Sequence, residues 1–262
     1  MPYAIIGGTG FSRIVENQFK PELVRTPYGQ AKIYLGQLDG AEFVFLPRHG
    51  VDHTIPPHKI NYRANIRALK SLGVERIMAT FAVGSLHRGI PPKAVVALDQ
   101  FIDFTNGRES TFFDGGKSGL AHTEVNFPYC PGLQTAVVVA AKARGLEIMP
   151  KGTYVCTNGP RFETPAEVRM YAQLGGDVVG MTGVPEAPLA RELEMHYGAV
   201  AYSINWGAGL EEKINVVADL EGIKQTVFES FVVALQTATT DDCECESALM
   251  MSHPPTQEEF NA

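Results

Sequence analysis

The feature that most constrains the fold is the alternation of short apolar segments with helix-like segments along most of the chain. Strand-like segments are expected at residues 3–6, 31–35, 41–46, 76–81, 177–181 and 199–204. Helices are expected at residues 61–72, 134–144, 164–174, 186–196 and 221–237. Because strands that alternate with helices form a mainly parallel sheet covered on both faces, we expect an α/β fold with a mixed, mainly parallel central sheet.

The clearest local signal is the start of the helix at Thr164. In Thr164-Pro165-Ala166-Glu167, the hydroxyl and the carboxylate can each accept a hydrogen bond from the other residue's backbone, and proline suits the first helical position. The glycines at 175–176 end this helix. The last helix is amphipathic, with an inward face that is expected to consist of Ile223, Val227, Phe231 and Leu235.

The size and charge of the chain limit its organisation and its partners. Its 262 residues suffice for one large domain, which we expect at residues 1–240, with a polar tail at 241–262 that is mobile or packed on a neighbouring subunit. The formal net charge of −7 argues against nucleic acid or a membrane surface as a partner. The first ten residues lack the features of a signal peptide, and no apolar run is long enough to span a membrane. A cytoplasmic protein is expected.

The four cysteines are Cys130, Cys156, Cys243 and Cys245. Their spacing matches neither a zinc motif nor a disulfide framework, so free thiols and no metal site are expected. The pair His49 and His53 has the spacing of a helical zinc motif, but Gly50 and the following prolines disfavour a helix there. A serine hydrolase is disfavoured because the G-x-S-x-G motif is missing.

Polar residues follow or end several of the expected strands. Ligands of open α/β sheets gather at the carboxyl ends of strands, so these residues are candidates for binding an anion or a polar heterocycle. They are Gly8, Thr9, Arg48, His49, Thr80, Phe81, Ala82, Met181, Thr182 and Asn205.

Two of these segments have more than one interpretation. The glycines at 7–10 either cradle a phosphate with backbone N–H groups or form only a tight turn. A Rossmann-type nucleotide-binding module would need an acidic residue at the end of a second strand, and Glu22 lies in a stretch expected to be a loop. Arg48 and His49 suit a phosphate, or are a surface arginine and a structural histidine. The other histidines, His196 among them, are expected to be structural or on the surface.

An ordered series of motifs resembles the trimeric family of purine nucleoside phosphorylases and methylthioadenosine phosphorylases. The matching stretches are IIGGTG at 5–10, RHG at 48–50, HTIPPHKINYRANIRAL at 53–69, GSL at 84–86, DQFIDFT at 99–105, FFDG at 112–115, NGPRFET at 158–164 and MTGVPEAPLA at 181–190. The resemblance extends to about residue 237 and implies the three-layer nucleoside phosphorylase fold. It implies phosphorolysis of a purine nucleoside, with inorganic phosphate as co-substrate and no metal or organic cofactor.

The resemblance also assigns roles to residues of this chain. Met181 is expected to pack on the ribose and Phe162 to form an aromatic wall against the base. The family forms homotrimers, so a homotrimer or a dimer of trimers is expected, and residues 122–131 are expected to form a lid or to contact a neighbouring subunit. The implied phosphate pocket consists of Gly8, Thr9, Arg48, His49, Thr80, Ala82 and Thr182.

Two positions indicate which base is bound. Glu163 can accept the N1–H of a 6-oxopurine and would repel the N1 lone pair of adenine. Asn205 can donate to O6 or N7 of the base, and both residues are the candidates for catalysis at the leaving group. Where the methylthioadenosine enzymes carry Asp-x-Asp, this chain has Asn205-Trp206-Gly207. The alternative for Glu163 is that it only caps the helix that follows.

The expected pocket for the 5′ end of the nucleoside points to a second feature of the substrate. The 6-oxopurine enzymes of this family place a histidine in the stretch that corresponds to residues 213–219, and this chain has none. Val216 and Val217 suit an apolar 5′ substituent there, unless they face the core. The combination predicts S-methyl-5′-thioinosine as substrate, followed by inosine or guanosine and then by methylthioadenosine.

Overall fold

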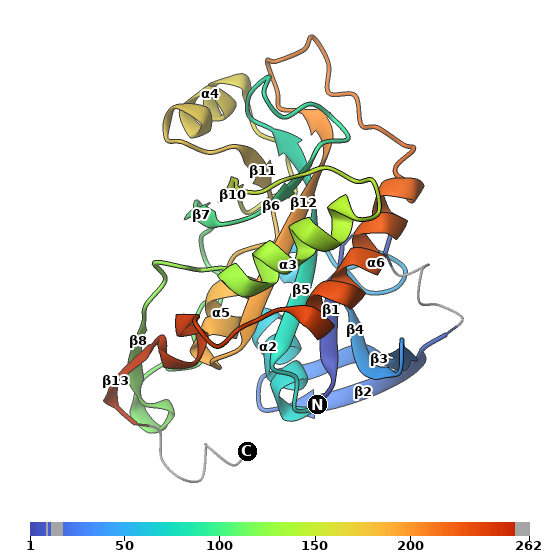
Figure 1. Cartoon of the computed structure of the whole chain (residues 1–262). Coiled ribbons are helices and arrows are strands. Elements are labelled where there is room, and N and C mark those ends of the chain that lie inside the picture. Colours follow the sequence, from blue (N-terminus) through green and yellow to red (C-terminus); the bar gives the residue numbers. More distant parts are fainter. Residues whose placement is uncertain (9, 12–17, 255–262) are drawn as a thin grey trace.

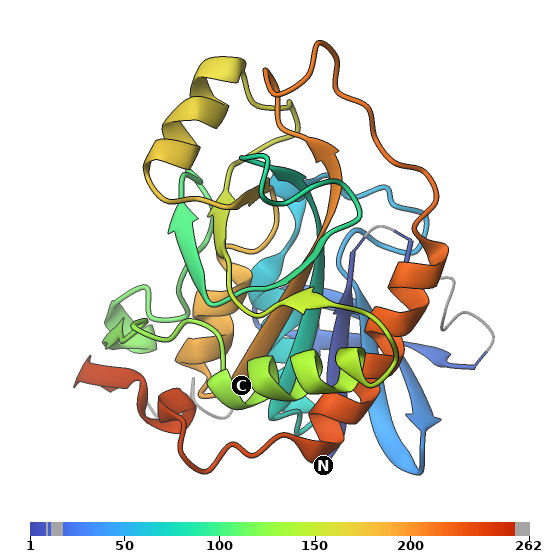
Figure 2. The ribbon, with the colours of Figure 1, turned by 45° about the horizontal axis from the view of Figure 1, so that its top comes forward.

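The chain folds around an eleven-stranded mixed sheet, seen from two angles in Figures 1 and 2. The structure, a computed structural model, describes residues 1–8, 10, 11 and 18–254. Near the centre, β1 (Tyr3–Gly7) pairs in parallel with β4 (Ala41–Pro47) on one side and with β5 (Arg76–Ser85) on the other. The strands β2 (Lys20–Thr26) and β3 (Gly29–Leu38) extend this half of the sheet as an antiparallel edge.

The other half of the sheet is built around β12 (His196–Trp206), which pairs in parallel along the whole length of β5. The short strands β6 (Val95–Ala97) and β9 (Ile148–Met149) follow β12 in the sheet. A separate branch contains β11 (Val178–Gly180), β10 (Thr153–Cys156) and β7 (Gln100–Asp103), and it joins the sheet where β11 pairs with the end of β5.

The sheet therefore forks along one edge of β5. The first part of this edge pairs with β1 through Ile77–Ala79, and the last part pairs with β11 through Gly84 and Ser85. Since β12 occupies the opposite edge, residues 80–83 face the gap between β1 and β11. In a strand, the main-chain groups of alternate residues point to opposite edges. Thr80 O accepts a hydrogen bond at the fork, so Ala82, two residues further on, presents its main-chain groups to the same gap.

Helices cover both faces of the sheet, which confirms the expected three-layer α/β fold (Figures 1 and 2). On one face, α3 (Pro131–Lys142) contacts α6 (Glu221–Thr237), and on the other face α2 (Tyr62–Ser71) contacts α5 (Glu186–Glu192). The side chains of β1 alternate between the two cores: Ile5 belongs to the core under α3 and α6, and Ile6 to the core under α2 and α5.

A third, smaller apolar cluster lies under α4 (Pro165–Gln173). The expected capping box is present, because Thr164 Oγ1 accepts from Glu167 N at 3.2 Å and the Glu167 carboxylate accepts from Thr164 N at 2.7 Å. Val168 and Tyr171 of the helix pack there against Val155 and Val179 of the forked branch. The helix is thereby held beside the gap in the sheet.

Several expected boundaries were wrong. The helix expected at 186–196 ends at Glu192, because Glu194 adopts a left-handed backbone conformation with φ of 54° and His196 already begins β12. The strand expected at 76–81 continues to Ser85, because its last residues pair with β11 and β12. The stretch around Glu22, expected to be a loop, forms β2 by pairing with β3.

The described part of the C-terminal segment packs on its own chain, whereas the sequence led us to expect a mobile tail or one bound to a neighbour. After the short 3₁₀ helix η3 (Glu244–Ser247), β13 (Leu249–His253) pairs antiparallel with β8 (Leu120–Thr123). Cys245 and Ala248 are buried here, which gives this polar segment an apolar anchor. Two further 3₁₀ helices are η1 (Pro57–Lys59) and η2 (Gly116–Ser118). Within the described residues, no helix has the length and apolar character that crossing a membrane requires.

Candidate active site

A cavity of about 570 Å³ opens at the fork of the sheet. Its volume lies in the range of sites for small molecules, roughly 300–1,000 Å³. It is lined by residues 80–84 of β5 and by the segments that follow β1 and β4. The loops before α4 and after β11, together with the end of β12, complete its wall.

The cavity brings together most of the residues singled out from the sequence. Those in its wall are Gly8, Arg48, His49, Thr80, Phe81, Ala82, Phe162, Glu163, Met181, Thr182, Asn205 and Gly207. Trp206 and Val216 are not part of the wall, and Thr9 lies outside the described residues. Wall residues that the sequence analysis did not select are His53, Thr54, Ile55, Pro56, Pro57, Val83, Gly84, Pro160, Val179, Gly180, Ile204, Ala208 and Ile214.

Arg48 is fully buried at one end of the cavity and is paired with Glu186, the first residue of α5. Its Nε and Nη2 donate to the two carboxylate oxygens of Glu186, each at 2.6 Å. Its Nη1 donates to Thr80 O at 3.0 Å, and Tyr197 Oη donates to Glu186 Oε1 at 2.6 Å. The bidentate pair fixes the plane of the guanidinium and directs Nη1 toward the fork.

The same pair keeps Arg48 charged in spite of its burial. Burial by itself lowers the pKa of Arg48, but the adjacent Glu186 carboxylate outweighs this effect, so the pKa is raised above its ordinary value. Glu186 was not predicted to belong to the site. One signal was available, namely a single acidic residue in the otherwise apolar stretch 184–190, where an acid that is buried needs a partner.

Gly8 and Thr80 present a second set of donors beside Arg48. Gly8 N donates to Thr80 Oγ1 at 3.1 Å, so the hydroxyl hydrogen of Thr80 is available to a ligand. A Cβ atom on Gly8 would lie 3.2 Å from Thr80 O and 3.5 Å from Arg48 Nη1. Glycine therefore lets the backbone after β1 approach β5 closely. With the main chain of Ala82, these groups form one end of the cavity that is suited to an anion.

His49 is neutral at physiological pH. Burial, followed by the charges of Arg48 and His53, lowers its pKa from 6.5 to about 4, although the bond to the Ile55 carbonyl acts in the opposite direction. His49 Nδ1 lies 2.8 Å from Ile55 O and donates to it, since a carbonyl oxygen only accepts. The proton of the neutral ring is then on Nδ1, and Nε2 can accept a hydrogen bond, for example from the hydroxyl of a protonated oxyanion.

This histidine should make stability depend on pH. Because its pKa is about 4 in the folded chain and near 6.5 when exposed, the unfolded chain binds more protons between these values. Its stabilising contribution is complete above pH 6.5 and is lost as the pH falls toward 4. We expect His49→Asn, whose amide can still donate to Ile55 O, to flatten urea unfolding free energies over this interval. The exposed His58→Asn is the control, and equal pH profiles for wild type and His49→Asn would contradict the assignment.

Glu163, in contrast to Arg48, contributes an acceptor to the wall of the cavity. Thr157 Oγ1 donates to Glu163 Oε1 at 2.9 Å. The alternative that Glu163 only caps α4 does not apply, because Thr164 and Glu167 supply that cap themselves. Thr157, which follows β10, was missed because the strand that precedes it was not predicted from the sequence.

Asn205 reaches the cavity through an irregularity in β12. The register with β5 shifts between Ser203 and Asn205, so that Ile204 is an extra residue and both Ile204 and Asn205 line the cavity. Asn205 Nδ2 donates to Trp206 O at 2.8 Å, which leaves its carbonyl oxygen and one N–H for a ligand. A Cβ on Gly84 would lie 3.2 Å from Asn205 Nδ2, so glycine makes room for this side chain.

The stretch expected to bind the 5′ end of a nucleoside enters the wall through a different residue. Ile214 lines the cavity, whereas the Val216 side chain is 54% exposed outside it and Val217 packs against the hydrophobic core. Val217 is held there because its N–H donates to Ile204 O at 2.7 Å. Trp206 points away from the cavity and packs against Arg88, whose guanidinium carbon lies 5.0 Å from the ring centre.

Arg108 connects the loop that contains the wall residue Met181 to the loop after β10, and no motif of the sequence indicated it. Its Nη2 donates to Met181 O at 2.7 Å and to Thr157 O at 3.2 Å, and Nη1 donates to Val184 O. One side chain thus joins the loop after β10 to the loop after β11. The planar fork of arginine makes such multiple bonds possible.

We expect Arg108→Lys to impair this positioning. Lysine carries a single ammonium group, which cannot reach both loops in the same geometry. Loss of bonds to a charged donor should reduce the free energy of unfolding by about 1–3 kcal/mol. The KM of the nucleoside should rise more than kcat falls, which steady-state kinetics and urea unfolding would measure. The matched control is Arg144→Lys, because Arg144 donates to Ala140 O and does not line the cavity. Equal effects of the two variants would contradict the positioning role of Arg108.

Comparison with known proteins gives an independent view of this arrangement. The sequence model of the family described as Phosphorylase superfamily matches residues 2–235. A 6-oxopurine nucleoside phosphorylase of Pyrococcus furiosus is 48% identical over 256 residues, which are 94% of this chain and 97% of that protein. A probable S-methyl-5′-thioinosine phosphorylase of Methanocaldococcus jannaschii is 47% identical over 222 residues, covering 84% and 85% of the two chains. A methylthioadenosine phosphorylase from an Antarctic soil metagenomic library has a similar crystal structure, with a TM-score of 0.86, 34% identity and coverage of 98% and 93%.

Proposed function

We propose that this chain, which belongs to the phosphorylase superfamily and is an enzyme of the pentosyltransferase type, uses inorganic phosphate to cleave 6-oxopurine nucleosides. The observation that carries this proposal is the polarity of the cavity. Its wall combines donors from Arg48, Thr80 and the main chain of Ala82 with the carboxylate of Glu163 and the amide of Asn205.

The proposed mechanism assigns the anion-binding end to phosphate. Phosphate is a weak nucleophile, and holding it against the anomeric carbon can lower the barrier by several kcal/mol, on the order of 7–11 in the best intramolecular reactions. Its negative charge also stabilises the positive charge that develops on the ribose. Neutral His49 can accept a hydrogen bond from a protonated phosphate oxygen through Nε2, and Arg48, whose charge is balanced by Glu186, can donate to the phosphate through Nη1. In this mechanism Met181 packs on the ribose, and Phe162 packs against the base.

The other end of the cavity is assigned to the base. Glu163 accepts the N1–H of a 6-oxopurine, and Thr157 holds the carboxylate in place for this bond. Asn205 donates to N7 or O6, where negative charge accumulates as the purine leaves. An adenine base has no N1 proton, so it would leave the carboxylate without a partner at a cost of about 1–3 kcal/mol.

A second candidate substrate, S-methyl-5′-thioinosine, concerns the 5′ end of the same nucleoside. The valines that first suggested an apolar 5′ pocket lie outside the cavity, so inosine and guanosine are placed ahead of it. What favours the methylthio substrate is Ile214, an apolar wall residue in the stretch 213–219 that has no histidine. Ile55 and Pro57 add further apolar surface to the wall.

One experiment tests both the preferred base and the preferred 5′ substituent. It compares phosphate-dependent cleavage of inosine, guanosine, methylthioinosine, adenosine and methylthioadenosine. We expect kcat/KM for the 6-oxopurine nucleosides to exceed that for the corresponding adenine nucleosides by about 5- to 150-fold, which corresponds to about 1–3 kcal/mol. Equal rates for the two bases would contradict the role of Glu163. A higher kcat/KM for methylthioinosine than for inosine would support an apolar pocket for the 5′ substituent. A higher kcat/KM for inosine would exclude such a pocket.

A further inference from the structure

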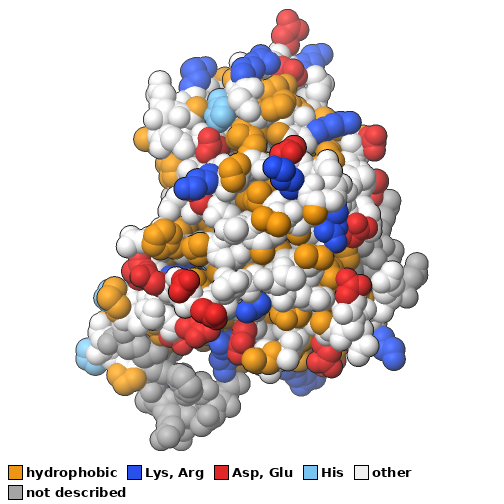
Figure 3. Space-filling view, in the orientation of Figure 1, with side chains coloured by type: hydrophobic (Ala, Val, Ile, Leu, Met, Phe, Trp, Pro, Cys, Tyr) orange, Lys and Arg blue, Asp and Glu red, His pale blue; other side chains and the backbone are white. Residues whose placement is uncertain are grey.

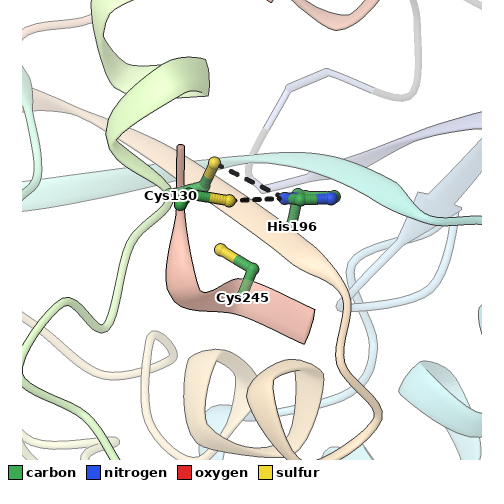
Figure 4. A group of neighbouring side chains, drawn as sticks. Cys130, His196 and Cys245 are labelled. Atoms are coloured by element: carbon green, nitrogen blue, oxygen red, sulfur yellow. Dashed lines mark hydrogen bonds between the residues drawn. The ribbon is translucent and has the colours of Figure 1, made fainter. Parts of the chain in front are cut away.

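Four potential metal ligands meet at the edge of the fold, away from the cavity. They are Cys130, His196, Cys243 and Cys245, and their ligand atoms all lie within 4.8 Å of one another. They come from three parts of the chain: the residue before α3, the first residue of β12, and the segment around η3. Figure 4 shows the side chains of Cys130, His196 and Cys245 turned toward a common centre.

The distances suit a tetrahedral ion. His196 Nδ1 lies 3.7 Å from Cys130 Sγ and 3.2 Å from Cys243 Sγ. In a tetrahedral zinc site with three thiolates and one imidazole, bonds of about 2.0–2.3 Å place neighbouring ligand atoms about 3.5–3.8 Å apart. Since no two of the four atoms are more than 4.8 Å apart, shifts of at most about 1 Å would bring them to the spacing of one tetrahedral ion.

The surroundings also match those of a structural metal site. Cys130, His196 and Cys245 are buried, and Cys243 is half-buried. The second ring nitrogen of His196, Nε2, lies 3.2 Å from Glu246 Oε1, so a carboxylate orients the imidazole and leaves Nδ1 free to coordinate. Metal-bound histidines generally have such a partner. Cys130 stands at the N-terminus of α3, where the helix dipole favours a negative thiolate.

Acidic side chains surround the entrance to this cluster. They gather in the part of Figure 3 where η3 lies in Figure 1. The exposed acids of this segment are Asp241, Asp242, Glu244 and Glu246. Their negative potential raises the local concentration of cations and supports entry of a divalent ion rather than of an anionic ligand.

We propose that Cys130, His196, Cys243 and Cys245 bind one zinc ion in a closed tetrahedral site. Three thiolates and one imidazole select a soft or borderline divalent ion, and four protein ligands leave no position for a substrate. The site is structural: it attaches the C-terminal segment, which carries β13, to α3 and β12. Spacing alone did not reveal it, because Cys243 and Cys245 are far in sequence from their other two partners.

The first test is the metal content of the untagged full chain, purified under reducing conditions from cells grown with added zinc. We expect inductively coupled plasma mass spectrometry to find about one zinc ion per chain. Cys245→Ser should lose most of this zinc. Cys156→Ser is the matched control, because Cys156 is also a buried free thiol but lies outside the cluster, and it should retain the ion.

A second measurement keeps the test valid if the cysteine variant does not fold. Cobalt added to the metal-free wild-type chain should produce thiolate-to-metal charge-transfer absorption and the strong visible bands of a tetrahedral site. Removing the metal should also speed proteolytic cleavage within residues 241–254, and added zinc should reverse this change. Folded, fully reduced chain that contains no zinc and shows no charge-transfer band with cobalt would overturn the proposal. So would a disulfide within the cluster in protein kept under reducing conditions.

Discussion

Replacing Arg48 by methionine is expected to damage both stability and phosphate use. Among the described residues, the variant leaves the buried Glu186 carboxylate with only the Tyr197 hydroxyl as a partner. Removing one member of a buried ion pair costs about 3–5 kcal/mol, which urea unfolding would measure. Loss of a donor aimed at the nucleophile should reduce kcat/KM for phosphate by on the order of 10²–10³.

The double variant Arg48→Met with Glu186→Gln separates these two effects. Glutamine is neutral and can still accept from Tyr197, so no charge remains buried without a partner. We expect the double variant to recover most of the lost stability while phosphate use stays impaired. If phosphate kinetics recover together with stability, Arg48 acts only through the fold, and its place in the phosphate site is wrong.

Exchanging the two side chains that are proposed to contact the base should change the preferred purine. In Glu163→Ser with Asn205→Asp, the acceptor for N1–H is lost, and a carboxylate takes the place of the amide. The new carboxylate can accept from the exocyclic amine of adenine or bind a protonated N7. We expect kcat/KM for inosine to fall by about 10–100-fold and the ratio of adenosine to inosine to rise by at least as much, in line with about 1–3 kcal/mol per lost bond.

A conservative variant tests whether Glu163 needs to be held in place. Thr157→Val removes the hydroxyl that donates to Glu163 at 2.9 Å and nearly preserves the size of the side chain. It should weaken the discrimination between inosine and adenosine without changing the phosphate KM. For the double variant Glu163→Ser with Asn205→Asp, an unchanged, wild-type ratio of inosine to adenosine kcat/KM would contradict the assignment of the base contacts.

The parts of the fold that could be predicted from the sequence are those fixed by local patterns. The helix α6 has the predicted bounds, 221–237, because its apolar spacing is long and regular, and α4 begins at the predicted cap. Strands β6 and β9 were missed because they contain only three and two residues, too few for a pattern. The end of α5 was missed because a left-handed residue, Glu194, stops a helix that the sequence pattern would continue.

Residues of the candidate site could be predicted where they belong to a sequence motif. Residues that reach the site only through the tertiary fold could not. Arg48, Glu163 and Asn205 lie within or next to recognisable motifs, and the cavity contains all of them. Arg108 comes from a loop with no pattern, and its contacts exist only because the sheet brings two distant loops together. Val216 was placed in the wall because only the composition of its stretch was visible. Which residue of an irregular segment turns inward depends on backbone geometry.

The fork in the sheet has a consequence for how such a protein can diversify. At the fork, Ala82 offers main-chain groups that no side-chain substitution can remove, whereas Arg48 and Thr80 offer side-chain donors. The groups proposed to recognise the base, Glu163 and Asn205, are side chains, and each can be replaced by a single mutation. Under the proposed function, the main-chain part of the anion site is therefore less open to mutation than the side chains that select the base. Substitutions at Glu163 and Asn205 can then change the preferred nucleoside while this part of the anion site is retained.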